Sequence, residues 1–340
     1  MASDNAYTRA GVDIAEGTRA VELMKAAVRA TYGPQVLAGI GAFGGLFDVS
    51  ALKGMAAPVL VASTDGVGTK TKVAARIGRW HTIGQDLVNH CINDILVQGA
   101  APLFFLDYVA MSKLDAAQVA AIVGGVAAAC RAAGIALLGG ETAEMPGVYE
   151  AGEIDLVGTI IGVVEKNAII DGARVQDGDT LLALPSSGLH TNGFSLARRA
   201  LAALDWEAAR ADLDGASIGD TLLAVHRSYL PDVQKLRLGG VEIRGLAHIT
   251  GGGVIDNLPR ILPPGLGAQI QRGTWPIPPI FALIQREGQI PDDDMFHVFN
   301  MGIGMLAVVP RQQAAQAGAT LPEACVVGHI RAGLDGVRIV

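Results

Sequence analysis

The feature that most constrains this chain is a short apolar run that opens directly into a glycine- and threonine-rich polar segment. Pro58-Val59-Leu60-Val61-Ala62 has the length and apolar character of a buried strand. The segment that follows, Ser63-Thr64-Asp65-Gly66-Val67-Gly68-Thr69-Lys70, combines glycines and hydroxyls with a carboxylate and an ammonium. We therefore expect a polar loop that is held at the end of a buried strand.

Helix and strand patterns alternate along the rest of the first half. Apolar residues at helical spacing predict a helix over residues 18–31. A second helix is predicted from His81 to Gln98, where Asp86, His90 and Asp94 form a polar stripe at four-residue spacing. The other predicted elements are strands at 104–108, 135–138 and 156–164 and an alanine-rich helix at 115–133.

A polar, glycine-containing stretch from Glu165 to Asp179 is typical of a connector. After it the pattern restarts with a strand at 180–184, a loop over 186–193 and a helix from Phe194. At 340 residues the chain is long enough for two domains of roughly 100–200 residues each. We expect an N-terminal domain over 1–170 and a C-terminal domain over 171–340, of α/β or α+β class with a mixed sheet in each.

Composition limits the classes of partner. Half of the residues are hydrophobic and 17% are charged, so a large core can form and disorder is not expected. The net charge is −7 and no basic run is present, which argues against nucleic acid as a partner, because phosphate-backbone binding needs clustered Lys and Arg. A small phosphorylated ligand is still compatible with an acidic chain, since glycine-loop N–H groups and a metal can supply the positive field.

The cysteines and the N-terminal sequence bear on the compartment. Cys91, Cys130 and Cys325 are far apart and form no CxxC pair, so neither a disulfide framework nor a zinc cluster is predicted. The first residues lack a basic region followed by an apolar core, and no uncharged apolar run reaches roughly 18 residues. We therefore expect a cytoplasmic protein that does not insert into a membrane.

The sequence contains parts of two phosphate-binding motifs, but neither has the context or the residues that the motif requires. Gly39-x-Gly41-x-x-Gly44 matches the dinucleotide fingerprint, yet Pro34 interrupts the approach and no clear helix start follows. A structural loop or a binding loop of another kind is the better interpretation. Lys70 follows Gly68-Thr69 and does not complete a Walker A motif, so a P-loop enzyme is not predicted.

Acidic residues beside these loops could hold a metal. Asp65 follows the first strand, Asp94 lies on a helix face, and Glu141 follows Gly139-Gly140 at the end of another strand. Magnesium usually takes one or two carboxylates together with phosphate oxygens and water. The residues alone leave two readings open: a metal-nucleotide site, or an acidic surface and a solvated Asp-Gly turn without any metal. His90 alone is more often a hydrogen-bonded structural residue, and we leave it out of the site.

The second half carries two further glycine-containing loops. His190 lies between Gly188 and Asn192 in a strand-to-helix loop, where it could bind substrate or act as a general acid or base. The same residues are also typical of a polar segment that merely begins a helix. Gly251-Gly252-Gly253 precedes a predicted helix start, where backbone N–H groups could hold a phosphate. A tight chain reversal explains these glycines equally well.

Taken in order along the chain, these segments resemble the phosphoribosylformylglycinamidine cyclo-ligase (aminoimidazole ribonucleotide synthetase) family. The segments that carry the resemblance are Ala10–Ile14, Ser63–Lys70, Asn93-Asp94, Phe104–Tyr108, Gly139–Gly147, Ser186–Leu196 and Thr250–Gly253. They span nearly the whole chain. The resemblance implies a homodimer in which the N-terminal domains pair to build a shared barrel-like sheet, with ATP near the interface, and a C-terminal α/β layered domain on the substrate side.

The resemblance also implies an activity. The family closes the imidazole ring of formylglycinamidine ribonucleotide and yields aminoimidazole ribonucleotide, ADP and phosphate. ATP phosphorylates the formyl amide oxygen, a nitrogen of the same substrate attacks the activated carbon, and phosphate leaves. Holding both ends of one substrate close together would supply much of the acceleration. The implied cofactors are ATP and Mg²⁺, and the implied partner is a phosphoribosyl amidine substrate.

The resemblance assigns roles to individual residues. Asp65, Asp94 and Glu141 are expected to hold magnesium, and Lys70, with Lys25, to neutralise charge during phosphate transfer. The other residues expected to bind the nucleotide are Thr64, Gly66, Gly68 and Thr69. Catalytic roles are expected for Lys70, His190 and Asn192. Substrate binding is expected at Ser187, Gly188, His190, Asn192, Gly251, Gly252 and Gly253.

Some positions depart from the family pattern, and relatives with a similar ATP domain have to be weighed. Thr8-Arg9 stands where the family often has a lysine, which puts a phosphate contact from this arm in doubt.

Selenophosphate synthetase would need an N-terminal reactive cysteine and the hydrogenase maturation factor a C-terminal one, and the chain has neither. Thiamine-monophosphate kinase would lack the Ser186–Leu196 signature. A nucleotide sensor without catalytic activity would bind ATP without releasing phosphate.

Overall fold

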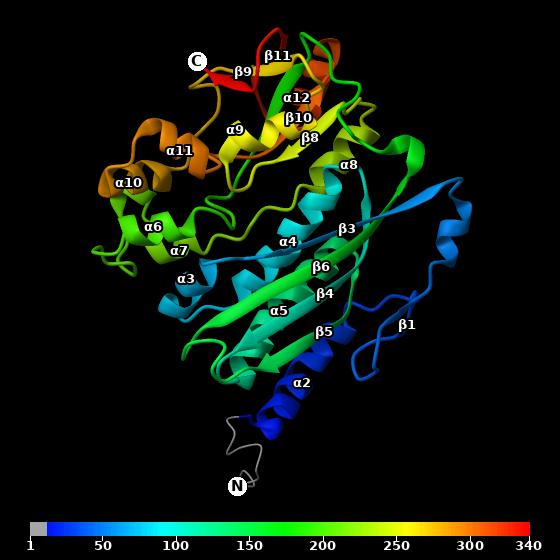
Figure 1. The fold of residues 1–340 in the computed structure, drawn as a ribbon, viewed down its shortest axis with the longest axis vertical. Helices are drawn as coiled ribbons and strands as arrows, with labels where there is room; N and C mark the ends of the chain where they lie inside the picture. The colour runs from blue at the N-terminus through cyan, green and yellow to red at the C-terminus, as the bar shows by residue number, and fades with distance from the viewer. Residues whose placement is uncertain (1–11) are drawn as a thin grey trace. The chain divides into compact units, whose positions relative to one another are not determined.

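The computed structural model describes residues 12–340, which form two compact units. The first unit extends to Ile95 and continues over Ala100–Asn167, and the second comprises Leu96–Gly99 and Ala168–Val340. Figure 1 shows the first unit in blue to green and the second in green to red. The Thr8-Arg9 arm lies outside the described residues.

A four-stranded mixed sheet forms the frame of the first unit, in the order β3-β6-β4-β5. Its strands are β3 (Pro58–Gly66), β4 (Ala101–Met111), β5 (Ala136–Glu144) and β6 (Ile154–Glu165). Strand β6 is antiparallel to both β3 and β4, whereas β4 and β5 are parallel. A two-stranded ribbon, β1 (Val36–Ala38) and β2 (Leu46–Phe47), accompanies this sheet.

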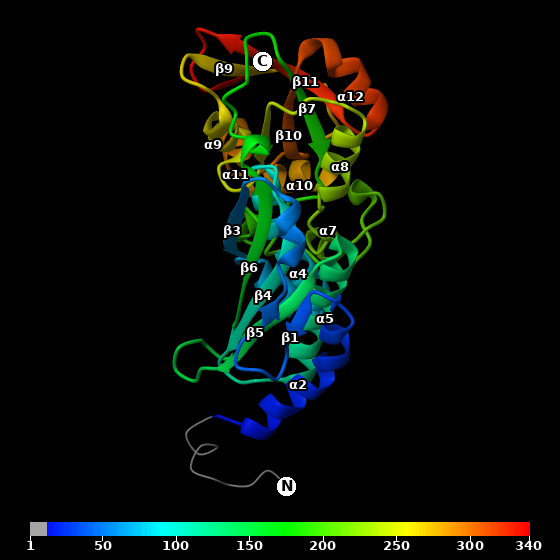
Figure 2. The same cartoon turned by 90° about the vertical axis from the view of Figure 1, so that its right-hand side faces the viewer.

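Helices cover one face of the sheet in the first unit (Figure 2). They are α2 (Ile14–Arg29), α4 (His81–Leu96) and α5 (Ala116–Ala133), and a short helix, α3 (Lys70–Ile77), follows β3. Alternation along β6 fits this arrangement, because Leu156 and Ile160 are buried while Val157 and Thr159 between them are partly exposed.

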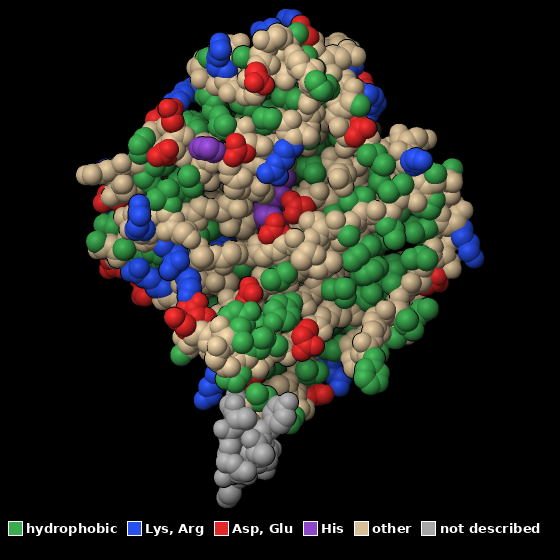
Figure 3. Space-filling view, viewed as in Figure 1, with side chains coloured by type: hydrophobic (Ala, Val, Ile, Leu, Met, Phe, Trp, Pro, Cys, Tyr) green, Lys and Arg blue, Asp and Glu red, His purple; other side chains and the backbone are tan. Residues whose placement is uncertain are grey.

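The opposite face of this sheet has no covering helix among the residues that the structure describes. Leu60 on β3 is 65% exposed, and Leu37, Phe43 and Leu46 in and between the ribbon strands are also more than half exposed. Figure 3 shows hydrophobic side chains gathered over this side of the first unit. Exposed apolar surface of this kind is typical of an interaction site.

Helix α5 has the length and apolar character of a membrane-spanning helix, and it is the one such helix in the described part of the chain. Half of its residues are buried inside the fold, where it packs against α2 and the sheet. A buried core helix passes the same test, so this finding is weak support for membrane insertion.

The second unit contains a six-stranded mixed sheet in the order β12-β9-β11-β7-β10-β8. Its strands are β7 (Thr180–Pro185), β8 (Gly245–His248), β9 (Leu266–Ile270), β10 (Ile303–Val309), β11 (Cys325–Ala332) and β12 (Val337–Ile339). Every pair is antiparallel except β12 and β9. All residues of β10 are buried, so this strand forms the centre of the core.

Seven α-helices of the described chain accompany this second sheet. They are α6 (Phe194–Ala200), α7 (Ile218–Leu222), α8 (Leu230–Leu238), α9 (Gly253–Asn257), α10 (Pro279–Gly288), α11 (Asp292–Val298) and α12 (Ala314–Thr320). The predicted fold class, with a mixed sheet in each half, is confirmed.

Two segments that the sequence predicts as loops are strand instead. Asp65 and Gly66 pair with Gly158 and Val157 of β6, so β3 continues through Gly66 and the connection to α3 is only Val67–Thr69. Strand β5 continues to Glu144, because its parallel ladder with β4 extends that far. The loop predictions are wrong there, since pairing with a neighbouring strand outweighs the local preference of glycine for turns.

Candidate active site

Two carboxylates and a histidine form a cluster at the end of β3, which we call the Asp65 cluster (Asp65, His90 and Asp94). His90 Nε2 lies 2.9 Å from Asp65 Oδ2 and 3.4 Å from Asp94 Oδ2. The Asp65 side chain is 48% exposed, whereas that of His90 is only 4% exposed. Ser63 Oγ donates to Asp94 Oδ2 over 3.2 Å and so helps to orient that carboxylate.

The charges of the Asp65 cluster depend on one another. Burial lowers the pKa of His90, but the hydrogen bond to Asp65 and the charge of Asp94 outweigh burial and leave this pKa raised. A positive charge between the two carboxylates is therefore favoured. Oxygen donors on either side of a favoured positive charge fit a hard divalent cation such as Mg²⁺.

His90 is the residue of this cluster that our interpretation of the sequence missed. The signal for it was present, because Asp86, His90 and Asp94 follow at four-residue spacing and share one face of α4. The sequence does not show that β3 brings Asp65 to that same face. We excluded His90 as a lone structural histidine, and the structure places it between the two predicted metal ligands.

Lys70 lies in the interior, with its ammonium against a carboxylate of α4. Its Nζ is 2.7 Å from Asp86 Oδ2, and both side chains are fully buried. Burial lowers the pKa of Lys70, an effect that Asp86 partly offsets. The expected position at an open phosphate site is therefore not observed, because the first turn of α3 directs this side chain toward α4.

Glu141 and Lys25 are remote from the Asp65 cluster within one copy of the chain. Asp65 lies on edge strand β3 and Glu141 on the other edge strand, β5, so that three strand spacings of about 4.8 Å separate them, roughly 14 Å in all. Lys25 lies on α2, which packs against α5 and β5, and its Nζ is 2.9 Å from Glu22 Oε1 on the same helix. A single copy of the described chain does not bring the three predicted metal ligands together.

The remaining nucleotide-binding candidates occupy the end of β3 and the turn after it. Thr64 Oγ1 lies 2.8 Å from Thr159 Oγ1 on the neighbouring strand. Gly66 closes the strand, and Gly68, with φ 53°, lies in the short turn that leads through Thr69 into α3. A left-handed backbone at Gly68 is readily adopted by glycine, which explains why glycine is needed there.

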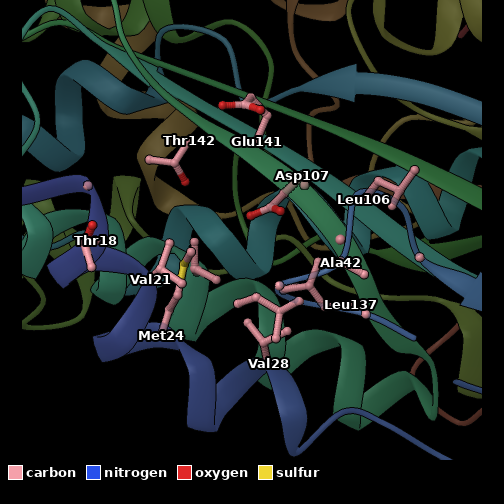
Figure 4. A pocket seen from close by; sticks show the side chains of 18 of the residues that line it. Thr18, Val21, Met24, Val28, Ala42, Leu106, Asp107, Leu137, Glu141 and Thr142 are labelled. Carbon is pink, nitrogen blue, oxygen red and sulfur yellow. The ribbon is translucent and has the colours of Figure 1, made fainter. Parts of the chain in front are cut away.

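A cavity of about 880 Å³ lies at the β5 end of the first unit (Figure 4). Apolar side chains of α2, including Val21, Met24 and Val28, form one wall, and the glycine-containing segment 39–45 forms another. Asp107 and Glu141 supply carboxylates to its lining. Its volume falls within the range of small-molecule sites.

The glycines of Gly39-x-Gly41-x-x-Gly44 are the one sequence motif that marks this cavity. These glycines line it, and β2 follows them in place of the helix of a dinucleotide-binding turn. Burial raises the pKa of Asp107, which the sequence analysis did not single out, to about 7. The cavity thus contains a carboxyl group that is readily protonated near neutral pH.

In the second unit the two predicted substrate loops lie side by side. A Cβ atom at Gly251 would lie 3.3 Å from Asn192 Oδ1, so the loop before α9 adjoins the loop between β7 and α6. The Ser187 N–H donates to His190 Nε2 over 3.2 Å, and Asn300 Nδ2 donates to the Gly188 carbonyl over 2.8 Å. These contacts hold the β7 to α6 loop in one conformation.

Two of these loop residues have unusual backbone angles. His190 has φ 61°, a left-handed conformation that is uncommon for a residue with a side chain and is often found at functional sites. Gly252 has φ 93° and immediately precedes α9, with Gly253 as the first residue of the helix. His226, which no sequence motif marks, stacks on His190 and contacts His248.

Comparison with known families agrees with this fold and these loops. Residues 49–164 match the family described as AIR synthase related protein, N-terminal domain, and residues 176–340 match its C-terminal domain. Thiamine-monophosphate kinase from Stenotrophomonas maltophilia K279a is similar in structure, with a TM-score of 0.69 and 21% identity over 93% of this chain and 95% of that chain. Hydrogenase maturation protein HypE in complex with ATP gives 0.64 and 20% over 95% and 90%.

Curated relatives narrow the class further. Phosphoribosylformylglycinamidine cyclo-ligase of Geobacillus kaustophilus (strain HTA426) is 51% identical over 338 residues, covering 96% of each chain. The protein of the same name from Desulfitobacterium hafniense (strain DSM 10664 / DCB-2) is 48% identical over 97% of this chain and 98% of that one. The chain belongs to the phosphoribosylformylglycinamidine cyclo-ligase family, within the AIR synthase related proteins.

Proposed function

We propose that this protein catalyses the ATP-dependent cyclisation of formylglycinamidine ribonucleotide to aminoimidazole ribonucleotide, with release of ADP and phosphate. The observation that carries the proposal is the identity of about half of all residues, over nearly the full length, with relatives that bear the cyclo-ligase name. The Ser186–Leu196 segment and the Asp65 cluster supply the polar groups that such a reaction needs.

The reaction proceeds through an activated oxygen. The formyl amide oxygen attacks the γ-phosphorus of ATP, the bond to ADP breaks, and the amide nitrogen loses its proton. The amidine nitrogen then forms a bond to the formyl carbon and loses its proton, and the carbon–oxygen bond breaks as phosphate leaves with the former formyl oxygen. Both reacting groups belong to one substrate, so positioning supplies a large part of the acceleration.

Asp65 and Asp94 are the carboxylates assigned to magnesium. Their oxygens lie on either side of His90 Nε2, and carboxylate oxygens are ligands that a hard cation prefers. Bound Mg²⁺ would neutralise charge on the ATP phosphates. The ammonium of Lys70 would bind Asp86 and so hold the start of α3 in place. Through the Thr69 turn, this contact would influence phosphate transfer.

The rest of the nucleotide site is assigned to a second copy of the chain. Glu141 lines the cavity beside β5, far from Asp65 in its own copy, whereas pairing of two first units would allow Glu141 of one copy to approach Asp65 of the other. The uncovered, apolar face of the sheet supports such a homodimer. The cavity would then hold the remainder of ATP next to the shared metal site.

A hybrid dimer tests this arrangement. Two differently tagged chains, one with Asp65→Asn and one with Glu141→Gln, are co-expressed and the mixed dimer is purified through both tags. If the two residues act across copies, one of the two sites keeps both residues and the hybrid retains about half of the wild-type activity per dimer. If they act within one copy, each site has a lesion and the hybrid is as inactive as either variant.

The substrate is assigned to the second unit. His190 and Asn192 would face the amidine or formyl end, Ser187 and Gly188 would support that loop, and Gly251–Gly253 would take the ribose phosphate at the start of α9. Residues 1–170 are accordingly the ATP-binding and dimerisation domain, and residues 171–340 the substrate domain. Three free cysteines, two of them buried, are compatible with a reducing cytoplasm.

A product assay tests the function. Purified protein is incubated with ATP, Mg²⁺ and formylglycinamidine ribonucleotide, and the aminoimidazole product and phosphate are followed together. We expect equal amounts of both and no phosphate without the substrate. Phosphate release in the absence of product, or no turnover beside an active control enzyme, would contradict the proposal.

A further inference from the structure

Asp107 lies on β4 and lines the cavity at the β5 end of the first unit. Figure 4 shows its carboxyl group directed into the cavity, between Glu141 and the apolar side chains of α2. Asp107 is the ladder partner of Gly140 on β5, and a Cβ atom at Gly140 would lie 1.9 Å from Asp107 Oδ1. Such a contact is a clash, so the glycine at position 140 leaves the room that the carboxyl group occupies.

Two other carboxylates of the cavity lining are engaged by the backbone. Glu144 Oε1 accepts from the Leu114 N–H over 2.8 Å, and Glu144 Oε2 accepts from the Asp13 N–H. Asp13 Oδ1 in turn caps the N-terminus of α2. Within residues 12–340, the hydrogen bond that lowers the pKa of Asp107 comes from its own backbone N–H. The Asp107 carboxyl group is therefore available to a ligand.

The surroundings of Asp107 favour its neutral form. Burial raises the pKa of Asp107 to about 7, and its own N–H offsets this effect only in part. The described residues that line the cavity include no Lys or Arg. The titratable groups on the neighbouring elements are all acids, namely Asp13 before α2, Glu141 and Glu144 of β5, and Cys130 of α5. A protonated carboxyl group offers one O–H donor and one carbonyl acceptor side by side.

The cavity suits the base of ATP better than its phosphates. Carboxylates without a cation repel a triphosphate, whereas Val21, Met24 and Val28 can pack against a flat, uncharged ring. Adenine presents an amino donor next to a ring-nitrogen acceptor, and the side-chain amides of asparagine and glutamine recognise that edge with one acceptor and one donor. The protonated carboxyl group of Asp107 has the same pair of groups.

We propose that Asp107 recognises adenine in this cavity, by accepting a hydrogen bond from the 6-amino group and donating one to the adjacent ring nitrogen. The inference rests on the proposed function, because it concerns the base of the same ATP whose phosphates are assigned to the metal site. Asp107 is then a specificity-determining residue that selects the nucleotide and takes no part in phosphate transfer.

A comparison of ATP with purine riboside triphosphate, which lacks the 6-amino group, tests this contact. Dissociation constants are measured by calorimetry with Mg²⁺ and without the amidine substrate. In wild-type protein, loss of the amino group should raise the dissociation constant about tenfold, since the buried carbonyl group loses its donor. In Asp107→Ala, ATP should bind at least about tenfold more weakly than in wild type, and the two nucleotides should bind equally.

Two variants serve as controls for this comparison. Asp107→Asn keeps one donor and one acceptor, so it should keep the preference for ATP. Glu150→Gln, at an exposed acidic position of the same unit, should keep it as well. An undiminished preference for ATP in folded Asp107→Ala overturns the assignment.

A second measurement needs neither turnover nor the alanine variant. The protonated carboxyl group of Asp107 should give an infrared carbonyl band at neutral pH that Asp107→Asn lacks. ATP should shift this band more than purine riboside triphosphate does, because only ATP donates to the carbonyl oxygen. A band that is absent, or that bound ATP does not move, overturns the contact even if Asp107→Ala fails to fold. Wild-type protein that shows the preference and the shift but makes no product would contradict the proposed function and support the contact.

Discussion

The Asp65 cluster and the three buried histidines of the second unit, His190, His226 and His248, place polar side chains in different surroundings. Asp65 is half-exposed at the end of an edge strand, and its carboxylate and that of Asp94 both lie close to His90 Nε2. His190, His226 and His248 are buried; His226 stacks on His190, and its Nε2 lies 3.1 Å from His248 Nε2. A charged group is stable where solvent or a cation can approach it. Burial away from water favours polar groups that remain neutral.

The comparison predicts the largest effect on activity at Asp65. Asp65→Asn keeps the size of the side chain and removes the charge, so we expect kcat to fall by about 10³-fold or more with the fold intact. The Mg²⁺ concentration needed for half-maximal activity should rise in parallel. Glu150→Gln, at an exposed acidic position of the same unit, should behave like wild type. Unchanged magnesium dependence in Asp65→Asn would remove this carboxylate from the metal site.

A large effect on stability is expected at the buried pair of Lys70 and Asp86. Asp86→Ala leaves an ammonium buried without its counter-ion, which should lower the free energy of unfolding by about 3–5 kcal/mol in urea titrations. Lys70→Met combined with Asp86→Leu removes both charges and should recover most of that loss. Equal losses in the single and the double variant would show that the pair does not act as a buried ion pair.

Asp107 is a third kind of carboxyl group, because the described residues that line the cavity around it include no Lys or Arg. Its pKa of about 7, against an ordinary value of 3.8, means that the folded state binds more protons than the unfolded state between about pH 4 and 7. Stability contributed by protonated Asp107 is therefore lost as the pH rises through this window.

Asp107→Asn should remove this pH dependence. We expect the variant to be more stable than wild type by about 1–3 kcal/mol at pH 8 and equally stable near pH 4. Unfolding in urea at several pH values measures the difference. A constant offset between the two proteins at all pH values would contradict the raised pKa and point to a change in packing alone.

The sequence predicted the alternation of strands and helices well but not where side chains meet. Asp65 and Asp94 were identified because each follows a clear pattern, and the four-residue spacing included His90 as well. Their contact depends on β3 lying against α4, which no local pattern records. The burial of Lys70 has the same origin, since its partner Asp86 belongs to another helix.

The three buried histidines of the second unit are a stronger example of contacts that no local sequence pattern predicts. His226 and His248 lie in segments without any motif, one before α8 and one at the end of β8, yet their Nε2 atoms lie 3.1 Å apart. Strand order is set by packing of the whole core and not by the residues near each histidine. Glu141 was predicted from its glycine-rich context, but its separation from Asp65 follows from the same kind of strand order in the first unit.

In the proposed reaction the formyl oxygen of the substrate is transferred to phosphate during ring closure. The most direct test uses substrate labelled with ¹⁸O at the formyl group, with ATP, Mg²⁺ and wild-type protein, followed by mass analysis of the phosphate. We expect one ¹⁸O atom in each phosphate released and none in the imidazole product. Unlabelled phosphate, formed while the ring closes, would contradict it.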